Sequence, residues 1–197
     1  NQEEIDKSAN RIYDAVIELY KKKPKGWIID LRLNADGNIR PMLAGLSMFF
    51  KDGIVSYYID RNRTTTDETA FSSGDLTIAG VTQATIKNKT PFFKSNKAAI
   101  LIGPGTASSG EGVAVVFKQR RKTRLFGEAS AGLANSTEGF VFNNNGSYFL
   151  ISTANIADKK KKPLAEFVQP DVTVKSNDAF NDLANDNLVK EAIKWLK

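Results

Sequence analysis

Two adjacent serines and a glutamate lie where a hydrolase can present a nucleophile. They belong to residues 106–111 (TASSGE), which follow an apolar strand pattern at 98–102 (AAILI) and precede a helical pattern at 113–117 (VAVVF). A hydroxyl at such a strand-to-helix turn is accessible, and the free N–H groups of the new helix favour developing negative charge. Serine is also a common helix-capping residue, so the turn alone leaves catalysis and capping both open.

The amino-acid composition restricts the chemistry that this turn could support. The chain of 197 residues contains no histidine and no cysteine. A complete Ser-His-Asp triad, a histidine-ligated metal and thiolate chemistry are therefore excluded within this chain. A serine nucleophile here would need a lysine base or a base from outside the chain. We expect neither a metal nor a cofactor.

Overall composition and charge indicate one globular domain without a nucleic-acid partner. Hydrophobic residues make up 41% of the chain and charged residues 25%, and no apolar run has transmembrane length. The net charge is +6, but most basic residues are scattered. The densest cluster, residues 159–162, lies in a predicted loop and lacks interleaved aromatic residues, so we interpret it as solvated.

Helix and strand patterns alternate along the chain and predict an α/β fold around one core. Helices are predicted from near the N-terminus to about Tyr20, at 41–50, from about 108 onward and at 188–196. Strands are predicted at 26–32, 54–59, 98–102 and 124–126, with a hairpin of 139–142 and 148–151 turning at 143–146. The polar stretch 61–96 is predicted to be a segment that crosses the surface of the core, with short strands at 76–78 and 84–86.

Three segments, in order, resemble the C-terminal-processing (tail-specific) serine peptidase superfamily. Residues 28–38 (IIDLRLNADGN) are similar to its D-L-R-G-N-x-G-G strand and turn, and residues 125–132 (LFGEASAG) to its V-G-E-x-T-x-G segment. Between these two lies the segment 106–111, whose T-A-S-S-x-E form most resembles the nisin-resistance-protein-like branch. The resemblance implies a ClpP/crotonase-like core of stacked β-β-α units, with residues 1–197 forming a single catalytic-core domain.

Matching these motifs residue by residue implies a nucleophile and an oxyanion hole. Ser108, rather than Ser109, occupies the position of the family's nucleophile. The backbone N–H groups of Ser109 and Gly37 would then stabilise the oxyanion, and the missing side chain of Gly37 would allow close approach.

The resemblance also implies residues that bind substrate. Asn38 and Ile39 follow the proposed oxyanion turn and could bind the substrate backbone. Glu111 is assigned to substrate binding as well. Its alternative role is to order the turn as the N3 partner of Ser108 in a capping box.

The sequence departs from the family pattern where the general base should be. Leu133 stands at the position of the tail-specific lysine, and no lysine lies between Phe126 and Ala157. The resemblance to the nisin-resistance branch implies a Ser/His dyad instead, with the histidine in an N-terminal region. We therefore expect that this chain lacks an N-terminal cap or helical segment that supplies the base; the alternative is a member that has lost it. Leu33 and Asp36 also replace two glycines of the family turn.

The resulting functional prediction is a serine peptidase core that cleaves peptides or proteins near the C-terminus, with its general base outside this chain. The alternative is a non-catalytic ligand- or peptide-binding module on the same scaffold. The expected partner is a peptide or protein substrate. The resemblance implies an extracytoplasmic location and leaves room for a membrane anchor outside this chain, whereas the sequence indicates no oligomeric state.

Overall fold

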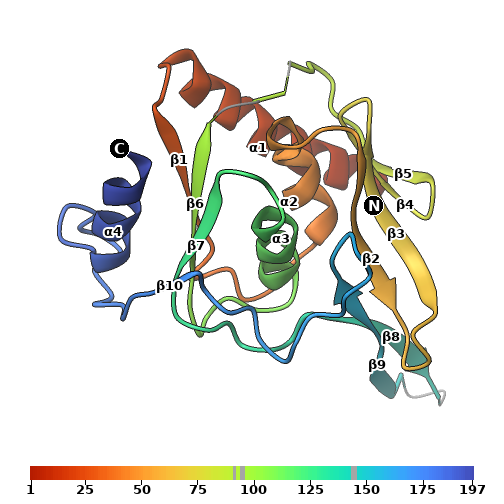
Figure 1. The fold of residues 1–197 in the computed structure, drawn as a ribbon. Coiled ribbons are helices and arrows are strands. Elements are labelled where there is room, and N and C mark those ends of the chain that lie inside the picture. Colours follow the sequence, from red (N-terminus) through yellow and green to blue (C-terminus); the bar gives the residue numbers. More distant parts are fainter. Residues whose placement is uncertain (91, 94–95, 143–145) are drawn as a thin grey trace.

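Two β-sheets flank a central helix, α3 (Ser109–Lys118), in the computed structural model of the chain (Figure 1). The structure describes residues 1–90, 92–93, 96–142 and 146–197. The first sheet is parallel and has the strand order β1 (Gly26–Asp30), β6 (Lys97–Ile102), β7 (Thr123–Gly127) and β10 (Val172–Thr173). The second sheet is antiparallel and has the order β5 (Val81–Ala84), β4 (Asp75–Ile78), β3 (Thr65–Ser72), β2 (Gly53–Ile59), β9 (Tyr148–Ala157) and β8 (Asn135–Val141).

The central strand β6 is apolar because both of its faces are covered. Ile100 and Ile102 pack in the larger core, which includes the apolar side chains of α3. Leu101 packs on the opposite face with Leu188 of α4 (Asn187–Leu196). A strand covered on both sides reads as a continuous hydrophobic run, which is why the pattern at 98–102 predicted it correctly.

The N-terminal helices pack over the same core as α3. Helix α1 (Gln2–Lys21) agrees with the predicted first helix. Helix α2 (Ile39–Gly45) begins earlier than predicted because the side chain of Asn38 accepts a hydrogen bond from the N–H of Arg40. It also ends earlier, and a short 3₁₀ turn, η1 (Ser47–Phe49), completes the segment that was predicted as one helix.

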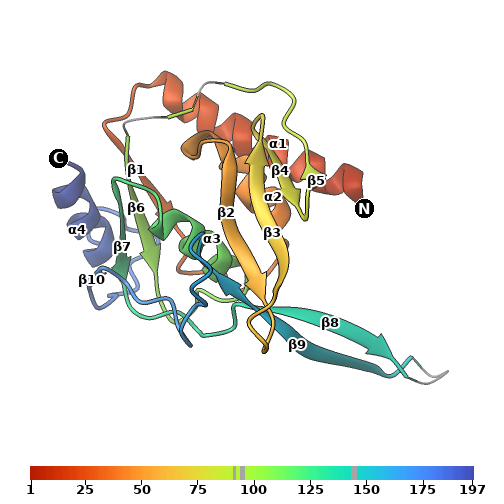
Figure 2. The ribbon, with the colours of Figure 1, turned by 45° about the vertical axis from the view of Figure 1, so that its right-hand side comes forward.

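The antiparallel sheet is more extensive than the sequence pattern suggested. Among the described residues of 61–96 there are three strands, β3, β4 and β5; β3 was not predicted, and β5 lies earlier than the predicted strand at 84–86. Strands β8 and β9 form the predicted hairpin, are longer than predicted, and project away from the rest of the molecule (Figure 2). The predicted turn at 143–146 lies largely outside the described residues.

A buried ion pair joins the end of β1 to the C-terminal helix. Arg32, 4% exposed, contacts the carboxylates of Asp30 at 2.6 Å and of Asp186 at 2.7 Å. Burial alone would raise the pKa of Asp186, but hydrogen bonds from Val189 and Arg32 and the charge of Arg32 hold that pKa below its usual value. Asp186 also caps α4 by accepting from the N–H groups of Leu188 and Val189. These contacts fix the strand end that leads into the glycine-containing turn.

The observed architecture confirms the predicted α/β class. Within the described part of the chain, no helix has both the length and the apolar character that a membrane crossing requires.

Candidate active site

The turn before α3 and the loop after β1 are held together by direct hydrogen bonds. The N–H of Ala107 donates to the carbonyl oxygen of Asn34 at 3.0 Å, and Thr106 Oγ1 donates to that of Leu31 at 2.9 Å. A side chain at Gly110 would collide with the carbonyl oxygen of Asn34, so only glycine allows this approach. The parallel pairing of β1 with β6 brings both segments to the same edge of the sheet, because parallel strands end on the same side.

Ser108 is the residue of this turn whose backbone is strained. It precedes α3 directly and has a backbone φ of 49° and ψ of −117°, a conformation that L residues rarely adopt. Such conformations cost about 1–3 kcal/mol and often occur at functional sites. The residue is half-buried and lines a cavity of about 100 Å³. A strained serine between a buried strand and a helix has the geometry of a presented nucleophile.

Ser109 differs from Ser108 in its surroundings. It is the first residue of α3 and is 6% exposed, and its Oγ is buried without a hydrogen-bond partner. A buried hydroxyl is poorly placed to attack a substrate. Its backbone N–H, by contrast, lies in the first turn of the helix and has no acceptor within that helix. The two serines therefore differ in burial, and the assignment of the nucleophile to Ser108 remains a prediction.

Gly37 lies in the same cavity as Ser108 and Ser109. Its backbone φ is 119°, and a Cβ added there would come within 3.0 Å of Met42 Cε and 3.8 Å of Ser109 Oγ. Its N–H donates to Oδ1 of Asp36 at 2.5 Å. Asp36 is one of the residues that replace a family glycine, so this departure places a carboxylate on the predicted oxyanion donor.

The antiparallel sheet supplies a wall of the cavity that the sequence did not reveal. Tyr58 of β2, Asn135 of β8 and Ile156 of β9 line it together with Ser108. Burial is the main factor that raises the pKa of Tyr58, the charge of Asp67 adds to the increase, and the charge of Arg40 opposes it. Tyr58 is therefore a neutral hydrogen-bonding group at pH 7 and not a base. Nothing in the local sequence around residue 58 indicated this position.

Glu111 holds the serine turn against the following loop. It is completely buried, and its carboxylate accepts four hydrogen bonds: from the N–H of Ser108 at 2.9 Å, Ser130 Oγ at 2.5 Å, the N–H of Gly132 at 2.9 Å and the N–H of Leu133 at 2.7 Å. These contacts match the capping alternative. The assignment of Glu111 to substrate binding is therefore replaced by a positioning role, because a carboxylate with no exposed surface does not reach a bound peptide in this conformation.

The other sequence-predicted residues are divided between the cavity and its margin. Ile39 lines the cavity. Asn38 is exposed, caps α2, and is not part of the cavity wall. The side chain of Leu133, at the position of the family lysine, is 62% exposed. Among the described residues that line the cavity there is no lysine.

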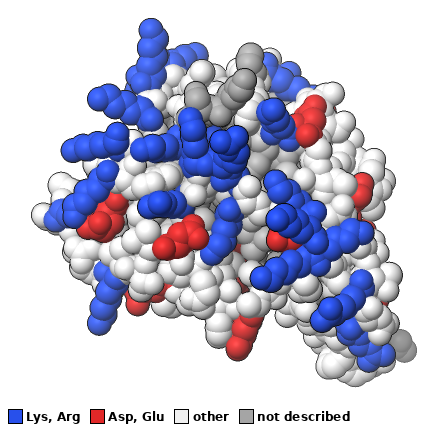
Figure 3. Space-filling view, viewed as in Figure 1, with Lys and Arg blue, Asp and Glu red and all other residues white. Residues whose placement is uncertain are grey.

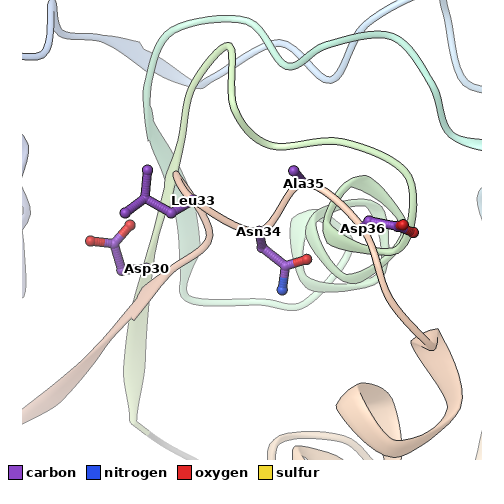
Figure 4. Close-up of a pocket in the computed structure, with 5 residues that line it drawn as sticks. All are labelled: Asp30, Leu33, Asn34, Ala35 and Asp36. Carbon is purple, nitrogen blue, oxygen red and sulfur yellow. The ribbon is translucent and has the colours of Figure 1, made fainter.

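A second, open cavity of about 610 Å³ adjoins the loop after β1. It is lined by Asp30, Leu33, Asn34, Ala35 and Asp36 (Figure 4). Asp30 and Leu33 lie at one end of this group and Asp36 at the other (Figure 4). The loop therefore separates two hollows, since Gly37 and Ile39 line the smaller cavity beside Ser108.

The α/β fold and the serine turn agree with the peptidase superfamily that the sequence resembles. Residues 2–174 match Peptidase family S41, and the chain belongs to this family. This finding confirms the resemblance described above.

Individual relatives agree with this assignment. The chain is 28% identical over 180 residues to a nisin-resistance protein of Lactococcus lactis subsp. lactis, covering 91% of this chain and 52% of the relative. A solved lipoprotein from Streptococcus agalactiae has a TM-score of 0.74 at 23% identity, covering 100% of this chain and 61% of that one. A photosystem II D1 C-terminal processing protease has a TM-score of 0.70 at 18% identity, covering 93% and 43%. These likenesses confirm the fold class that the resemblance implied, and the chain spans about half the length of the curated relative.

Replacing Gly37 with alanine tests whether the turn geometry matters to the chemistry. We expect Gly37→Ala to destabilise the protein by about 1–2 kcal/mol, because its positive φ is unfavourable for residues with a Cβ. We also expect the catalytic activity of the full-length protein to fall by roughly 10²-fold, because the change would displace the predicted oxyanion donor. Thermal unfolding and peptidase assays measure the two effects.

Gly53→Ala is the matched control. Gly53 has a φ of 126° and nothing within 4 Å of an added Cβ, so this change introduces backbone strain alone. Equal activity in the two variants would contradict a role for the Gly37 turn in catalysis.

Proposed function

We propose that this chain is the core of a serine peptidase in which Ser108 is the nucleophile. The observation that carries the proposal is the strained, half-buried turn that holds Ser108 in a cavity beside Gly37 and the first N–H of α3. Ser108 Oγ would attack the scissile carbonyl carbon, and the Ser109 and Gly37 N–H groups would bind the resulting oxyanion. The Gly37 N–H becomes available once Asp36 rotates away from it.

The general base is proposed to come from outside this chain. The sequence has no histidine, and the described residues lining the Ser108 cavity include no lysine. Tyr58, with its raised pKa, is suited to donate a hydrogen bond and not to accept the serine proton at neutral pH. A group brought by another segment or subunit would complete the site.

The substrate is proposed to be a peptide bound in extended form, cleaved near its C-terminus. Strand β8 lies at the edge of the antiparallel sheet as far as the sheet is described, and its first residue, Asn135, lines the Ser108 cavity. An extended peptide that added to this edge would be led toward the serine, with main-chain hydrogen bonds providing affinity. The open cavity beside Leu33 could receive a substrate side chain on the other side of the loop.

The location is proposed to be extracytoplasmic, with any membrane anchor outside this chain. Support comes from the relatives, of which one is named as a nisin-resistance protein and another as a lipoprotein.

The 197-residue chain alone is expected to show little or no peptidase activity. An unassisted serine hydroxyl is a weak nucleophile, and general-base catalysis typically contributes about 10²–10⁴-fold. Labelling by a fluorophosphonate probe should be slow for this chain and rapid for the full-length protein, at the same serine. Rapid peptide turnover by the isolated chain, lost in Ser108→Ala, would show that the chain contains its own base. The non-catalytic alternative predicts no turnover and no specific labelling in either form.

A further inference from the structure

A cavity of about 620 Å³ lies beside the C-terminal end of α3, at the opposite end of the helix from Ser108. Its apolar lining comes from α3, β2 and the segments that precede them: Phe49, Phe50, Ile54, Val55, Phe92 and Val116. Its volume lies in the range of pockets that bind small molecules. The Ser108 cavity shares none of these residues.

The polar lining of this cavity is strongly basic. Five basic residues and a single acidic one contribute to it: Lys51, Arg120, Arg121, Lys122, Lys159 and Asp52. The carboxylate of Asp52 accepts hydrogen bonds from the N–H groups of Ser73 at 2.9 Å and Gly74 at 3.1 Å. Its charge is thereby committed to the β3–β4 turn. Basic side chains also predominate over acidic ones on the face of the molecule that Figure 3 shows.

Arg120 provides a fixed positive charge at this site. Its guanidinium donates to the carbonyl oxygens of Phe49 at 2.8 Å and Asn96 at 2.8 Å, and it forms no ion pair with a carboxylate in the described part of the chain. Burial lowers the pKa of this guanidinium from its usual value. All five of its N–H groups have acceptors within the protein, so Arg120 would attract an anion through its charge and not through a direct hydrogen bond.

From this combination we infer that the cavity binds a single-chain amphiphile, with an anionic phosphate or carboxylate head and an apolar tail. The head would lie among the basic side chains at the rim, where charge-assisted hydrogen bonds are available. The tail would cover the aromatic and aliphatic lining and remove it from water. A ligand of one kind would not use the whole lining. A small anion would make no use of the apolar side chains, and a purely apolar ligand would make no use of the five basic residues.

Titration calorimetry of the folded chain with alkyl phosphates of different chain length tests the contributions of the anionic head and the apolar tail. Octyl phosphate should bind saturably below its micelle concentration, roughly tenfold more tightly than hexyl phosphate, because each buried methylene contributes about 0.8 kcal/mol. Inorganic phosphate and octyl glucoside each carry half of the recognition chemistry and should bind far more weakly. Equal binding of octyl glucoside and octyl phosphate would overturn the inference.

Charge-reversal variants locate the binding site. Lys51→Glu combined with Arg121→Glu should weaken octyl phosphate binding by roughly tenfold or more. The matched control is Lys175→Glu with Lys190→Glu, which changes the net charge equally but lies on the exposed surface around α4, and should leave binding unchanged. Ile54→Trp, at a position 38% exposed in the cavity, should also weaken binding by occupying space. Equal weakening by both charge pairs would indicate a nonspecific charge effect and contradict the site.

Two further probes separate a free amphiphile from macromolecular partners. In the first, the protein is sedimented with phosphatidylglycerol vesicles. If it binds the vesicles but not octyl phosphate, the basic face would be assigned to a membrane surface instead. The second probe is an acidic peptide. If the protein binds this peptide equally well with and without the Ile54→Trp change, and does not bind octyl phosphate, the basic face would be assigned to a protein partner. Either result would overturn the inference of a small amphiphile.

Discussion

Replacing Ser108 with alanine is expected to lower kcat/KM of the full-length protein by about 10⁴-fold or more while leaving peptide affinity intact. Loss of a serine nucleophile removes the chemical step, and the remaining rate reflects the oxyanion hole and binding alone. An extended substrate would be held mainly by main-chain hydrogen bonds, which this change does not touch. Turnover of a fluorogenic peptide and equilibrium binding of the same peptide measure the two quantities separately.

Ser109→Ala is the matched control for this experiment. The Oγ of Ser109 is buried without a hydrogen-bond partner, so its removal should leave stability within about 0.5 kcal/mol or increase it slightly. The backbone N–H proposed for the oxyanion hole remains in place, and activity should be retained. Loss of activity in Ser109→Ala with activity kept in Ser108→Ala would reverse the assignment of the nucleophile.

The elements that the sequence predicted well are those in which local pattern and tertiary environment agree. Strand β6 is a continuous apolar run because it is covered on both faces, and α3 follows a turn of small residues. The strand β3, in contrast, has the sequence TTDETAFS, whose polar residues conceal its pairing with β2 and β4. Its buried positions are set by neighbouring strands distant in sequence, which local pattern does not reveal.

The same division applies to the candidate site. Ser108, Ser109 and Gly37 could be proposed together because the motif match links their two short segments, and the parallel strands bring these segments to one cavity. Tyr58 and Asn135 could not, because they come from the antiparallel sheet and reach the cavity only through the packing of the two sheets around α3. The role of Glu111 depended on burial, which its charge alone would have argued against.

Replacing Glu111 with alanine is expected to destabilise the protein by about 3–5 kcal/mol, among the largest effects available to a single change here. Three backbone N–H groups and the hydroxyl of Ser130 would lose their common acceptor inside the protein. Glu111→Gln should cost less, about 1–3 kcal/mol, because the amide oxygen still accepts while the NH₂ group faces donors. Glu166→Ala, which removes an exposed carboxylate from a residue whose backbone lies beside Gly132, should stay within about 0.5 kcal/mol.

The positioning role requires more than loss of stability. Because Glu111 fixes the N–H of Ser108 and the loop at Gly132 together, Glu111→Gln should slow fluorophosphonate labelling of the full-length protein even at temperatures where the variant is fully folded. Peptide affinity should change little, since the carboxylate has no exposed surface with which to contact a ligand. A folded Glu111→Gln protein that labels at the wild-type rate would show that the glutamate only stabilises the fold. A selective loss of peptide affinity would restore the substrate-binding role that its place in the motif first suggested.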